Sequence, residues 1–281
     1  MRWFLVGALA ILAFAANSLL ARAALADGTT GAGMFAGLRL LAGALVLLPF
    51  LDRGWLGRHV GGGAMLALYA ILFAFAYVRL DAASGALILF AVVQATIVGV
   101  GAARGGKVGR LGSVGILLAF AGVALLLAPG ARGVDPLGAA MMAAAGVGWG
   151  AYTLIGQQGG SAAGRNAESF LIAAIIALPL LLLDGAVSAR GALLALLSGA
   201  VTSGLGYVAW YAVAPRLSLT GVAAVQLATP PATALLAWPL LGEMPGARLA
   251  LASALVLGGI ALAMRGPPAR SARLAEPERG G

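Results

Sequence analysis

The chain has 281 residues, of which 62% are hydrophobic and 10% are charged. A soluble domain carries roughly a quarter charged residues, so this composition excludes a soluble globular protein and indicates a membrane protein. The net charge of +9 does not indicate a nucleic-acid partner, because the basic residues are spread over the connections between apolar segments. Cysteine is absent, which excludes disulfides and thiolate metal sites, and we expect no cofactor.

Ten apolar segments are long enough to cross a bilayer as helices, which takes about 20 mostly apolar residues. They lie near Trp3–Leu20, Gly33–Phe50, Gly62–Val78, Ala82–Ala102, Gly109–Leu127, Leu137–Ile155, Ser169–Leu183, Leu193–Val213, Leu219–Leu241 and Ala247–Met264. These runs are too long and too uniformly apolar for the strands of a transmembrane barrel. We therefore expect an all-α integral membrane protein with ten transmembrane helices and no soluble catalytic domain.

The two halves of the chain resemble each other at a shift of 137 positions without any gap. At this shift the run Gly122-Val-Ala-Leu falls on Gly259-Ile-Ala-Leu. Each half holds five spans, and an odd number of spans inverts the second half relative to the first. We predict two inverted five-helix repeats and a disordered cytoplasmic tail, at residues 1–130, 131–265 and 266–281. Inverted repeats place a binding site near the bilayer midplane, between two halves that can rock.

The basic residues sort to one side of the membrane if the N-terminus is cytoplasmic. Twelve of the 18 Lys and Arg residues then lie on the cytoplasmic side and five on the other, while Arg39 lies within a span. This bias predicts a multi-pass protein of the bacterial inner (plasma) membrane with both termini in the cytoplasm. Ala21-Arg22-Ala23 after an apolar run imitates a signal-peptide cleavage site. Cleavage would break the five-plus-five symmetry, so we expect an uncleaved first span.

Motifs near the end of the chain resemble a known transporter family. The run Leu241-Gly-Glu243-Met-Pro, followed by Leu255-Val-Leu-Gly-Gly-Ile, resembles the end of a repeat in the drug/metabolite transporter superfamily, and more narrowly in its EamA-type branch. Pro230-Pro231 and Arg39-Leu40 match the same pattern. The resemblance implies a ten-helix exporter of amino acids or related metabolites, and the aromatic amino-acid exporters are one candidate branch.

The first half departs from the family pattern at two places. Val93-Gln94 stands where the family usually has proline in span four, and Gly105-Gly106-Lys107 stands where it has Leu-Gly-Glu. These departures concern the fine mechanism and leave the expected fold unchanged.

Aromatic residues recur at helical spacing on three spans, although the chain has only 9 Phe, 5 Trp and 5 Tyr. We predict that three groups of aromatic residues line a substrate cavity. They are a stripe at i, i+4 and i+8 on span three, a cluster on span eight, which corresponds to span three in the second repeat, and a pair on span six. These residues are Tyr69, Phe73 and Tyr77, then Tyr207 and Trp210, then Trp149 and Tyr152. Packing, or an aromatic belt at the span ends, is the alternative interpretation.

Polar side chains within spans are costly in hydrocarbon, so they tend to face the bundle interior or a wet cavity. Asn17, Gln94 and Gln226 fit this description, and their amides suit the ammonium or carboxylate of a zwitterionic substrate. Hydrogen bonds between helices are the alternative role.

Arg39 is the only fixed charge deep within a predicted span. It must reach the interface, pair, or meet an anionic group, and we favour a structural or gating role over substrate binding. Pro230, Pro231 and Glu243 are assigned to the same structural and gating class, with Glu243 expected to cap or orient the last helix pair. All carboxylates before the tail, Glu168 included, are expected at span ends or in connections. This absence from the spans favours facilitated diffusion or exchange over proton coupling.

Competing function classes lack the residues that they require. An enzyme needs a nucleophile–base pair, a metal cluster or paired carboxylates, and the only histidine, His59, lies in a connection. A channel would show a polar ring or filter, and none is visible. We therefore predict a secondary transporter for small metabolites, with aromatic or large apolar amino acids favoured. A proton-coupled multidrug or other metabolite exporter is the alternative. Besides substrate and lipid we expect no partner; Gly33-x-x-x-Gly37 would suit a dimer face, although a monomer is expected.

Overall fold

In the computed structural model the described residues are 2–51, 57, 60–103, 110–128, 134–156, 161–216 and 225–264, and over these ranges the chain forms helices and no strand. The helices are α1 (Arg2–Leu25), α2 (Ala32–Leu47), α3 (Val60–Tyr77), α4 (Ala82–Ala103), α5 (Arg110–Leu127), α6 (Pro136–Gly156), α7 (Ala162–Leu183), α8 (Ala189–Leu197), α9 (Gly206–Val213), α11 (Thr229–Leu241) and α12 (Ala247–Met264). Short 3₁₀ turns, η1 (Leu48–Phe50) and η4 (Ala214–Arg216), extend α2 and α9. The π-helical segment η3 (Ser198–Leu205) joins α8 to α9.

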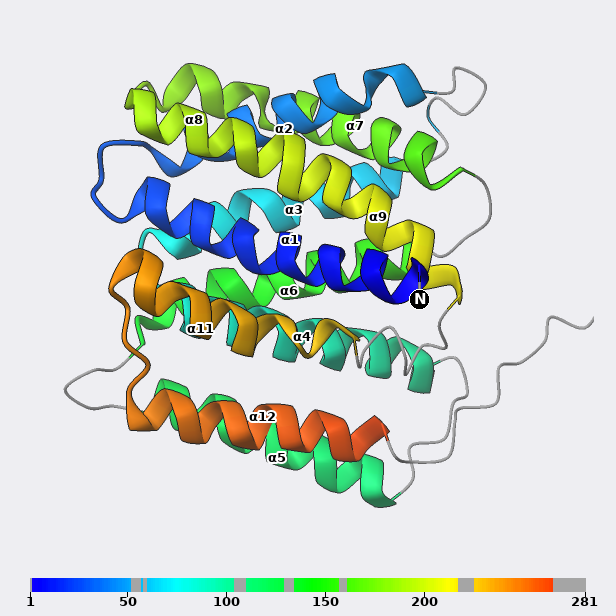
Figure 1. The fold of residues 1–281 in the computed structure, drawn as a ribbon, viewed down its shortest axis with the longest axis vertical. Helices are drawn as coiled ribbons and strands as arrows, with labels where there is room; N and C mark the ends of the chain where they lie inside the picture. The colour runs from blue at the N-terminus through cyan, green and yellow to red at the C-terminus, as the bar shows by residue number, and fades with distance from the viewer. Residues whose placement is uncertain are drawn as a thin grey trace, which may run out of the picture.

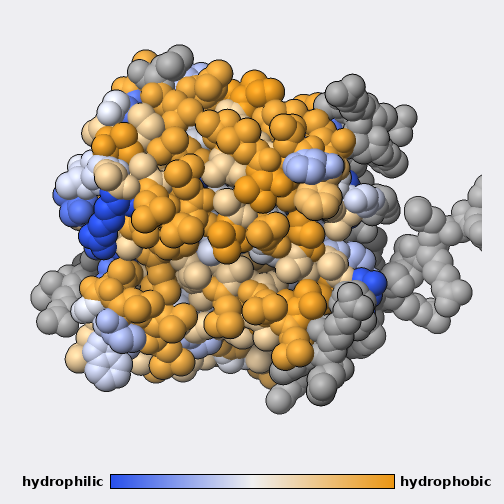
Figure 2. Space-filling view, turned by 45° about the horizontal axis from the view of Figure 1, so that its top comes forward, coloured by the Kyte–Doolittle hydropathy of each residue, from blue (hydrophilic) through white to orange (hydrophobic). Residues whose placement is uncertain are grey.

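These elements make ten helical rods that lie side by side in one bundle (Figure 1). In the described part of the chain, eight helices are long and apolar enough to cross a membrane, and the last helix adds a shorter apolar segment, Ala247–Ala263. Figure 2 shows hydrophobic residues over most of the face that it presents, with hydrophilic residues toward its left and right edges. A surface of this kind suits lipid and not water. The predicted all-α, ten-helix membrane fold is confirmed.

Capping residues set where several helices begin. Asp81 accepts a hydrogen bond from the Ser84 amide at 2.7 Å at the start of α4, and Asp135 accepts one from the Gly138 amide at 2.6 Å at the start of α6. Each cap satisfies a backbone donor that the first helical turn leaves open. Helix α11 ends at its capping residue Gly242, whose φ of 70° lies in the left-handed region, a conformation that glycine adopts without strain.

Helix α7 begins at Ala162, seven residues before the predicted start of span seven. Its cap is Ser161, whose hydroxyl accepts a hydrogen bond from the Gly164 amide at 3.2 Å. Glu168 therefore lies within the helix and is buried, so the expectation that every carboxylate before the tail lies outside the spans is wrong. The prediction failed because it used hydropathy to place the start, and the polar first turns of α7 are shielded by the bundle. The first residues of predicted span nine, 219–224, lie outside the described residues.

The helices pack in pairs that map onto each other when the two halves are exchanged. Helix α2 packs on its counterpart α7, and α5 packs on its counterpart α12. Helix α3 packs on α6, and their counterparts, the α8–η3–α9 rod and α1, pack on each other. This is the pattern that an inverted repeat produces. The proposed boundaries of the repeats stay a prediction. Figure 1 shows the α5–α12 pair at one edge of the bundle.

Two glycines allow α2 to lie close to its neighbours. A β-carbon at Gly199 in η3 would overlap the carbonyl oxygen of Arg39, and one at Gly43 would overlap the ring of Phe170 in α7. Small residues permit such close helix crossings in membrane proteins. The approach places Arg39 against η3 and α9, in the interior of the bundle.

Candidate functional site

A cluster of buried aromatic rings fills the middle of the bundle. Its members, called the aromatic cluster below, are Phe14, Tyr69, Phe73, Trp149, Tyr152, Tyr207 and Trp210. The Trp149 ring centroid lies 4.6 Å from that of Tyr207 and 5.1 Å from that of Tyr69. Because the rings come from α1, α3, α6 and α9, helices from both halves of the chain build the cluster.

Arg39 lies within this cluster and is 1% exposed. Its Nη2 donates hydrogen bonds to the hydroxyls of Tyr69 at 3.1 Å and Tyr207 at 3.0 Å, and its Nε donates to the Ser203 hydroxyl at 3.0 Å. Its Cζ lies 4.9 Å from the centroid of the Phe73 ring and 5.1 Å from that of Tyr69. Cation–π contacts of this kind offset only part of the cost of burying a charge.

The guanidinium of Arg39 is incompletely satisfied. Its Nη1 has no hydrogen-bond partner in the part of the chain that the structure describes. The ion pairs found there, Arg22–Glu243 and Arg79–Asp135, both lie elsewhere. Arg39 thus brings a full positive charge into the interior of the bundle, where its hydrogen bonds and cation–π contacts with the described residues are to hydroxyls and aromatic rings.

Asn17 uses its whole amide to join helices. Its Nδ2 donates to the Tyr69 hydroxyl at 3.1 Å, while its Oδ1 accepts from Ser198 at 2.6 Å and from Thr202 at 3.2 Å. These bonds connect α1, α3 and the α8–η3–α9 rod. The contacts therefore favour the interhelical role of Asn17 in this conformation, next to the aromatic cluster.

Gln226 completes the cluster from the segment before α11. The indole Nε1 of Trp149 donates to the Oε1 of Gln226 at 3.1 Å. Two further buried N–H donors, Nε2 of Gln226 and Nε1 of Trp210, have no partner among the described residues. Together with Nη1 of Arg39, the cluster therefore holds three donors that an oxygen atom of a ligand would satisfy. Each buried donor without an acceptor costs about 1–3 kcal/mol of folding free energy.

The cavity at the cluster is nearly closed. Its volume is about 10 Å³, and Phe14, Ser18, Tyr69, Phe73, Leu89, Phe90 and Trp149 line it. Such a space holds roughly one water molecule, whereas small-molecule sites usually measure about 300–1,000 Å³. In this conformation the space is therefore too small for a solute.

Two predicted cavity residues lie outside the aromatic cluster. Tyr77 packs on Phe73 with 4.6 Å between centroids, but its hydroxyl donates to the carbonyl of Ala82 at 3.3 Å, at the end of the bundle. Gln94 lines a groove of about 280 Å³ between α4 and the α5–α12 pair. Helical periodicity places Tyr69 and Phe73 on one face of α3, as the structure has them. It gives neither the position of Tyr77 along the bundle nor the side of α4 from which Gln94 extends.

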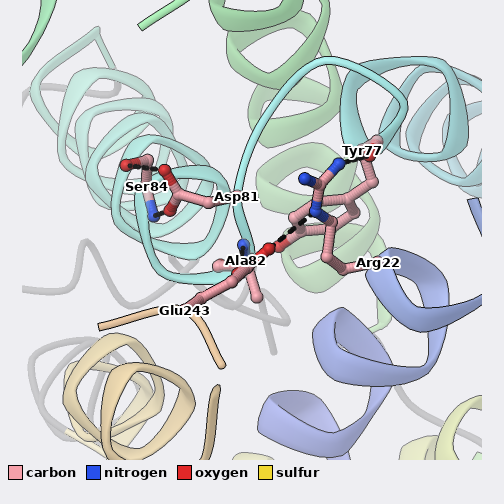
Figure 3. A network of polar contacts seen from close by, with 6 residues as sticks. All are labelled: Arg22, Tyr77, Asp81, Ala82, Ser84 and Glu243. Carbon is pink, nitrogen blue, oxygen red and sulfur yellow. Dashed lines mark hydrogen bonds and ion pairs between the residues drawn. The ribbon is translucent and has the colours of Figure 1, made fainter. Parts of the chain in front are cut away.

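Polar contacts join four helices at one end of the bundle, called the Glu243 end below and lying at the left of Figure 1. Arg22 pairs with Glu243 at 2.7 Å and donates to the Tyr77 carbonyl at 3.0 Å. The second oxygen of Glu243 accepts the amide of Ala82 at 2.7 Å (Figure 3). Glu243 thereby connects the turn after α11 to α1 and to the first residue of α4. A cavity of about 550 Å³, with Asp81 among its lining residues, opens beside this network.

The Pro230-Pro231 pair lies in the first turn of α11. Proline is tolerated there because the first helical amides have no partner within the helix. A turn at Leu227–Ala228 precedes α11, directly after Gln226. The pair therefore marks a break in the membrane helix beside the aromatic cluster, and its gating role stays a prediction.

Sequence reasoning missed several residues that contact Arg39, Tyr207 or Asn17. They are Phe14 and Phe170 beside Tyr207, Ser203 beside Arg39, and Ser198 and Thr202 beside Asn17. Phe14 lies three positions before Asn17, so it shares a helix face with a residue that was identified. Ser198 and Thr202 have the i, i+4 spacing of one helix face, so the spacing of the polar residues indicates them where the aromatic spacing does not.

Comparison with known proteins identifies the family. The sequence model of the EamA-like transporter family matches residues 136–265. The uncharacterized protein PA1977 of Pseudomonas aeruginosa is 45% identical over 97% of this chain and 98% of that protein. A crystal structure with 21% sequence identity superposes with a TM-score of 0.68, covering 93% of this chain and 96% of that chain, and it supports the fold alone. The chain therefore belongs to the EamA-like transporter family and is a multi-pass membrane transporter of the drug/metabolite transporter type.

Proposed function

We propose that the protein exports small metabolites by alternating access, and that amino acids with aromatic or large apolar side chains are its preferred substrates. The observation that carries this proposal is the aromatic cluster, whose rings lie together with three buried N–H groups that have no acceptor among the described residues. The rings suit an apolar side chain, and the donors suit the oxygen atoms of a carboxylate. Helices from both halves contribute, so a rocking motion between the halves would expose the cluster to each side in turn.

Facilitated diffusion or exchange is the proposed mode of coupling. In the described part of the chain, the hydrogen bonds and cation–π contacts of Arg39 are with hydroxyls and aromatic rings, and no carboxylate is among them. Glu168 in α7 is the observation that favours the alternative, a proton-coupled multidrug or other metabolite exporter, because a carboxylate buried in a span can load and release a proton.

The proposed location is the bacterial inner membrane, with both termini in the cytoplasm. The charge bias of the sequence supports this orientation, and the Glu243 end then faces the periplasm. A reporter fused after Gly281 tests it: phosphatase activity, which requires the periplasm, is expected to be absent, and fluorescence of a cytoplasmic reporter is expected to be present. The opposite pattern would overturn the orientation.

Competition in proteoliposomes tests the substrate class. Vesicles containing the purified protein are loaded with unlabelled phenylalanine, and uptake of radiolabelled phenylalanine is measured against external unlabelled amino acids. Tryptophan, tyrosine and leucine are expected to compete at lower concentration than glycine or alanine, because a large apolar side chain buries more apolar surface against the rings. Equal competition by all of them, or none by any, would contradict the proposed class.

A further inference from the structure

Arg39 carries a permanent positive charge that the described residues leave without a counter-ion. Its three hydrogen bonds go to the neutral hydroxyls of Ser203, Tyr69 and Tyr207. Its Nη1 has no hydrogen-bond partner, although the residue is 1% exposed. Buried charges in proteins are normally paired, because desolvation strongly disfavours an isolated ion. An anionic group placed at Nη1 would supply both the missing acceptor and the missing charge.

The surroundings of Arg39 provide for an anion and not for a second cation. Two more buried N–H groups, Nε2 of Gln226 and Nε1 of Trp210, belong to the same cluster and can only donate hydrogen bonds, so they too require an acceptor such as a ligand oxygen. The ring faces of Phe73 and Tyr69, which attract cations, are already occupied by the guanidinium at 4.9 and 5.1 Å. An ammonium group that enters without a carboxylate of its own would meet a like charge, and the hydrogen bonds and cation–π contacts of Arg39 with the described residues include no carboxylate.

We infer that Arg39 binds the carboxylate of the transported solute, so that the protein selects aromatic monocarboxylates whether or not they carry an amino group. This inference rests on the proposed function, because it assigns a substrate group to the same cluster. It assigns Arg39 a different role from the structural or gating role that the sequence favoured, and that role stays a prediction. Aromatic amides and amines, including cationic drugs of similar size, are excluded by the missing acceptors and by repulsion from the guanidinium.

A matched series of ligands tests the inference on the unmodified protein. Phenylalanine, 3-phenylpropionate, phenylalaninamide and phenethylamine share one ring and differ in the charged groups. Binding is measured as the shift in the thermal unfolding midpoint of the purified protein over a range of ligand concentrations. The two carboxylates are expected to bind about 10- to 100-fold more tightly than the amide and the amine, the range for one charge-assisted hydrogen bond. Inorganic phosphate, added as a small anion without a ring, is expected to give no shift.

Equal binding of all four aromatic compounds, tighter binding of the amine, or stabilisation by none of them would overturn the inference. Tight carboxylate binding without any exchange in vesicles would overturn the proposed function and leave the binding site standing. If exchange takes place but the amide and the acid inhibit it equally, the role of Arg39 is overturned and the proposed function stands.

Variants at Arg39 locate the effect. Arg39→Gln keeps a polar side chain without the charge and is expected to reduce the preference for acid over amide to within about threefold, while Arg39→Lys retains part of it. Arg22→Gln removes a partly buried arginine at the Glu243 end and serves as the control, with an unchanged preference expected. If Arg39→Gln fails to fold, the ligand series on the unmodified protein and on Arg39→Lys still decides the question.

Discussion

The guanidinium of Arg39 donates a hydrogen bond of 3.0 Å to the hydroxyl of Tyr207, and these two residues come from opposite halves of the chain. Arg39 lies on α2, whereas Tyr207 lies on α9, directly after the π-helical segment η3. The wider helical turn of η3 lies against the backbone of α2, where Gly199 leaves room for the carbonyl of Arg39. A π-helical segment in a membrane helix often accompanies a functional site. Here it lies where α2 of the first half of the chain packs against the α8–η3–α9 rod of the second half.

Removing the Tyr207 hydroxyl is expected to destabilise the protein. In Tyr207→Phe the Nη2 of Arg39 loses one of its two acceptors, and a hydrogen bond to a charged group contributes about 1.5–3 kcal/mol. Tyr211→Phe is the matched control, because it removes a neutral hydrogen bond of 3.0 Å to the Tyr152 carbonyl, worth about 0.5–1.5 kcal/mol. Thermal unfolding in detergent is expected to show the larger decrease for Tyr207→Phe. A larger decrease for Tyr211→Phe would mean that the Arg39 contacts contribute little.

The ion pair between Arg22 and Glu243 is expected to hold the Glu243 end closed. Glu243→Ala removes both the pair and the acceptor for the Ala82 amide, so α1, α4 and the turn after α11 lose their connection. The natural chain has no cysteine, so Ala83→Cys introduces a single thiol beside the cavity at this end. Labelling of that thiol by an impermeant maleimide is expected to become several-fold faster when Glu243→Ala is added.

The control for this experiment is Arg79→Ala in the same single-cysteine background. Arg79 and Asp135 are 3.6 Å apart with exposed fractions of 44% and 36%, and an ion pair this exposed contributes about 0–1 kcal/mol. We expect no change in labelling for this variant. Equal acceleration by both substitutions would show that the Glu243 network has no special part in closing this end.

Adjacent glycines in α12 provide a test of the α5–α12 contact. A β-carbon at Gly259 would overlap the backbone of α5 at Gly115, whereas a β-carbon at Gly258 meets nothing within 4 Å. Gly259→Ala is therefore expected to destabilise the protein by about 1–3 kcal/mol, and Gly258→Ala to leave stability unchanged or slightly raised. Unfolding midpoints of the two variants decide this. Equal midpoints would contradict the close crossing of these helices.

Proton coupling is tested at Glu168. Exchange of labelled phenylalanine is expected to be independent of an imposed pH gradient, and Glu168→Gln is expected to retain the exchange rate within about twofold. Uphill uptake driven by the gradient in the unmodified protein, lost in Glu168→Gln while exchange persists, would establish the proton-coupled alternative. The glutamine keeps the size and hydrogen-bonding capacity of the side chain, so a folding defect is not expected.

Hydropathy was sufficient to predict the ten spans, because membrane helices are long, uniformly apolar and separated by polar turns. Local capping shifted some ends: Ser161 starts α7 before two charged residues, so Glu168 was misplaced. Helical periodicity predicted that Tyr69 and Phe73 share one helix face and that Trp149 and Tyr152 share another, and in the structure these two faces are in contact.

The surroundings of Arg39 were not predictable in this way. Its position beside Ser203 and Tyr207 depends on the glycine contact at Gly199 and on the π-helical segment, and both arise from the approach of α2 to the α8–η3–α9 rod. Such contacts join residues more than 150 positions apart. Periodicity within a single helix carries no information about them.

We propose that the aromatic cluster is the substrate site of a carrier and that it opens to each side of the membrane in turn. Trans-stimulation measures this most directly: uptake of radiolabelled phenylalanine is compared between vesicles with and without internal unlabelled phenylalanine. We expect internal substrate to accelerate uptake, and Trp210→Ala, which opens the buried cluster, to abolish the acceleration. Trp238→Ala, at a tryptophan that is 54% exposed on α11, is expected to preserve it. Saturable uptake indifferent to internal substrate, or equal loss in the two tryptophan variants, would contradict the account.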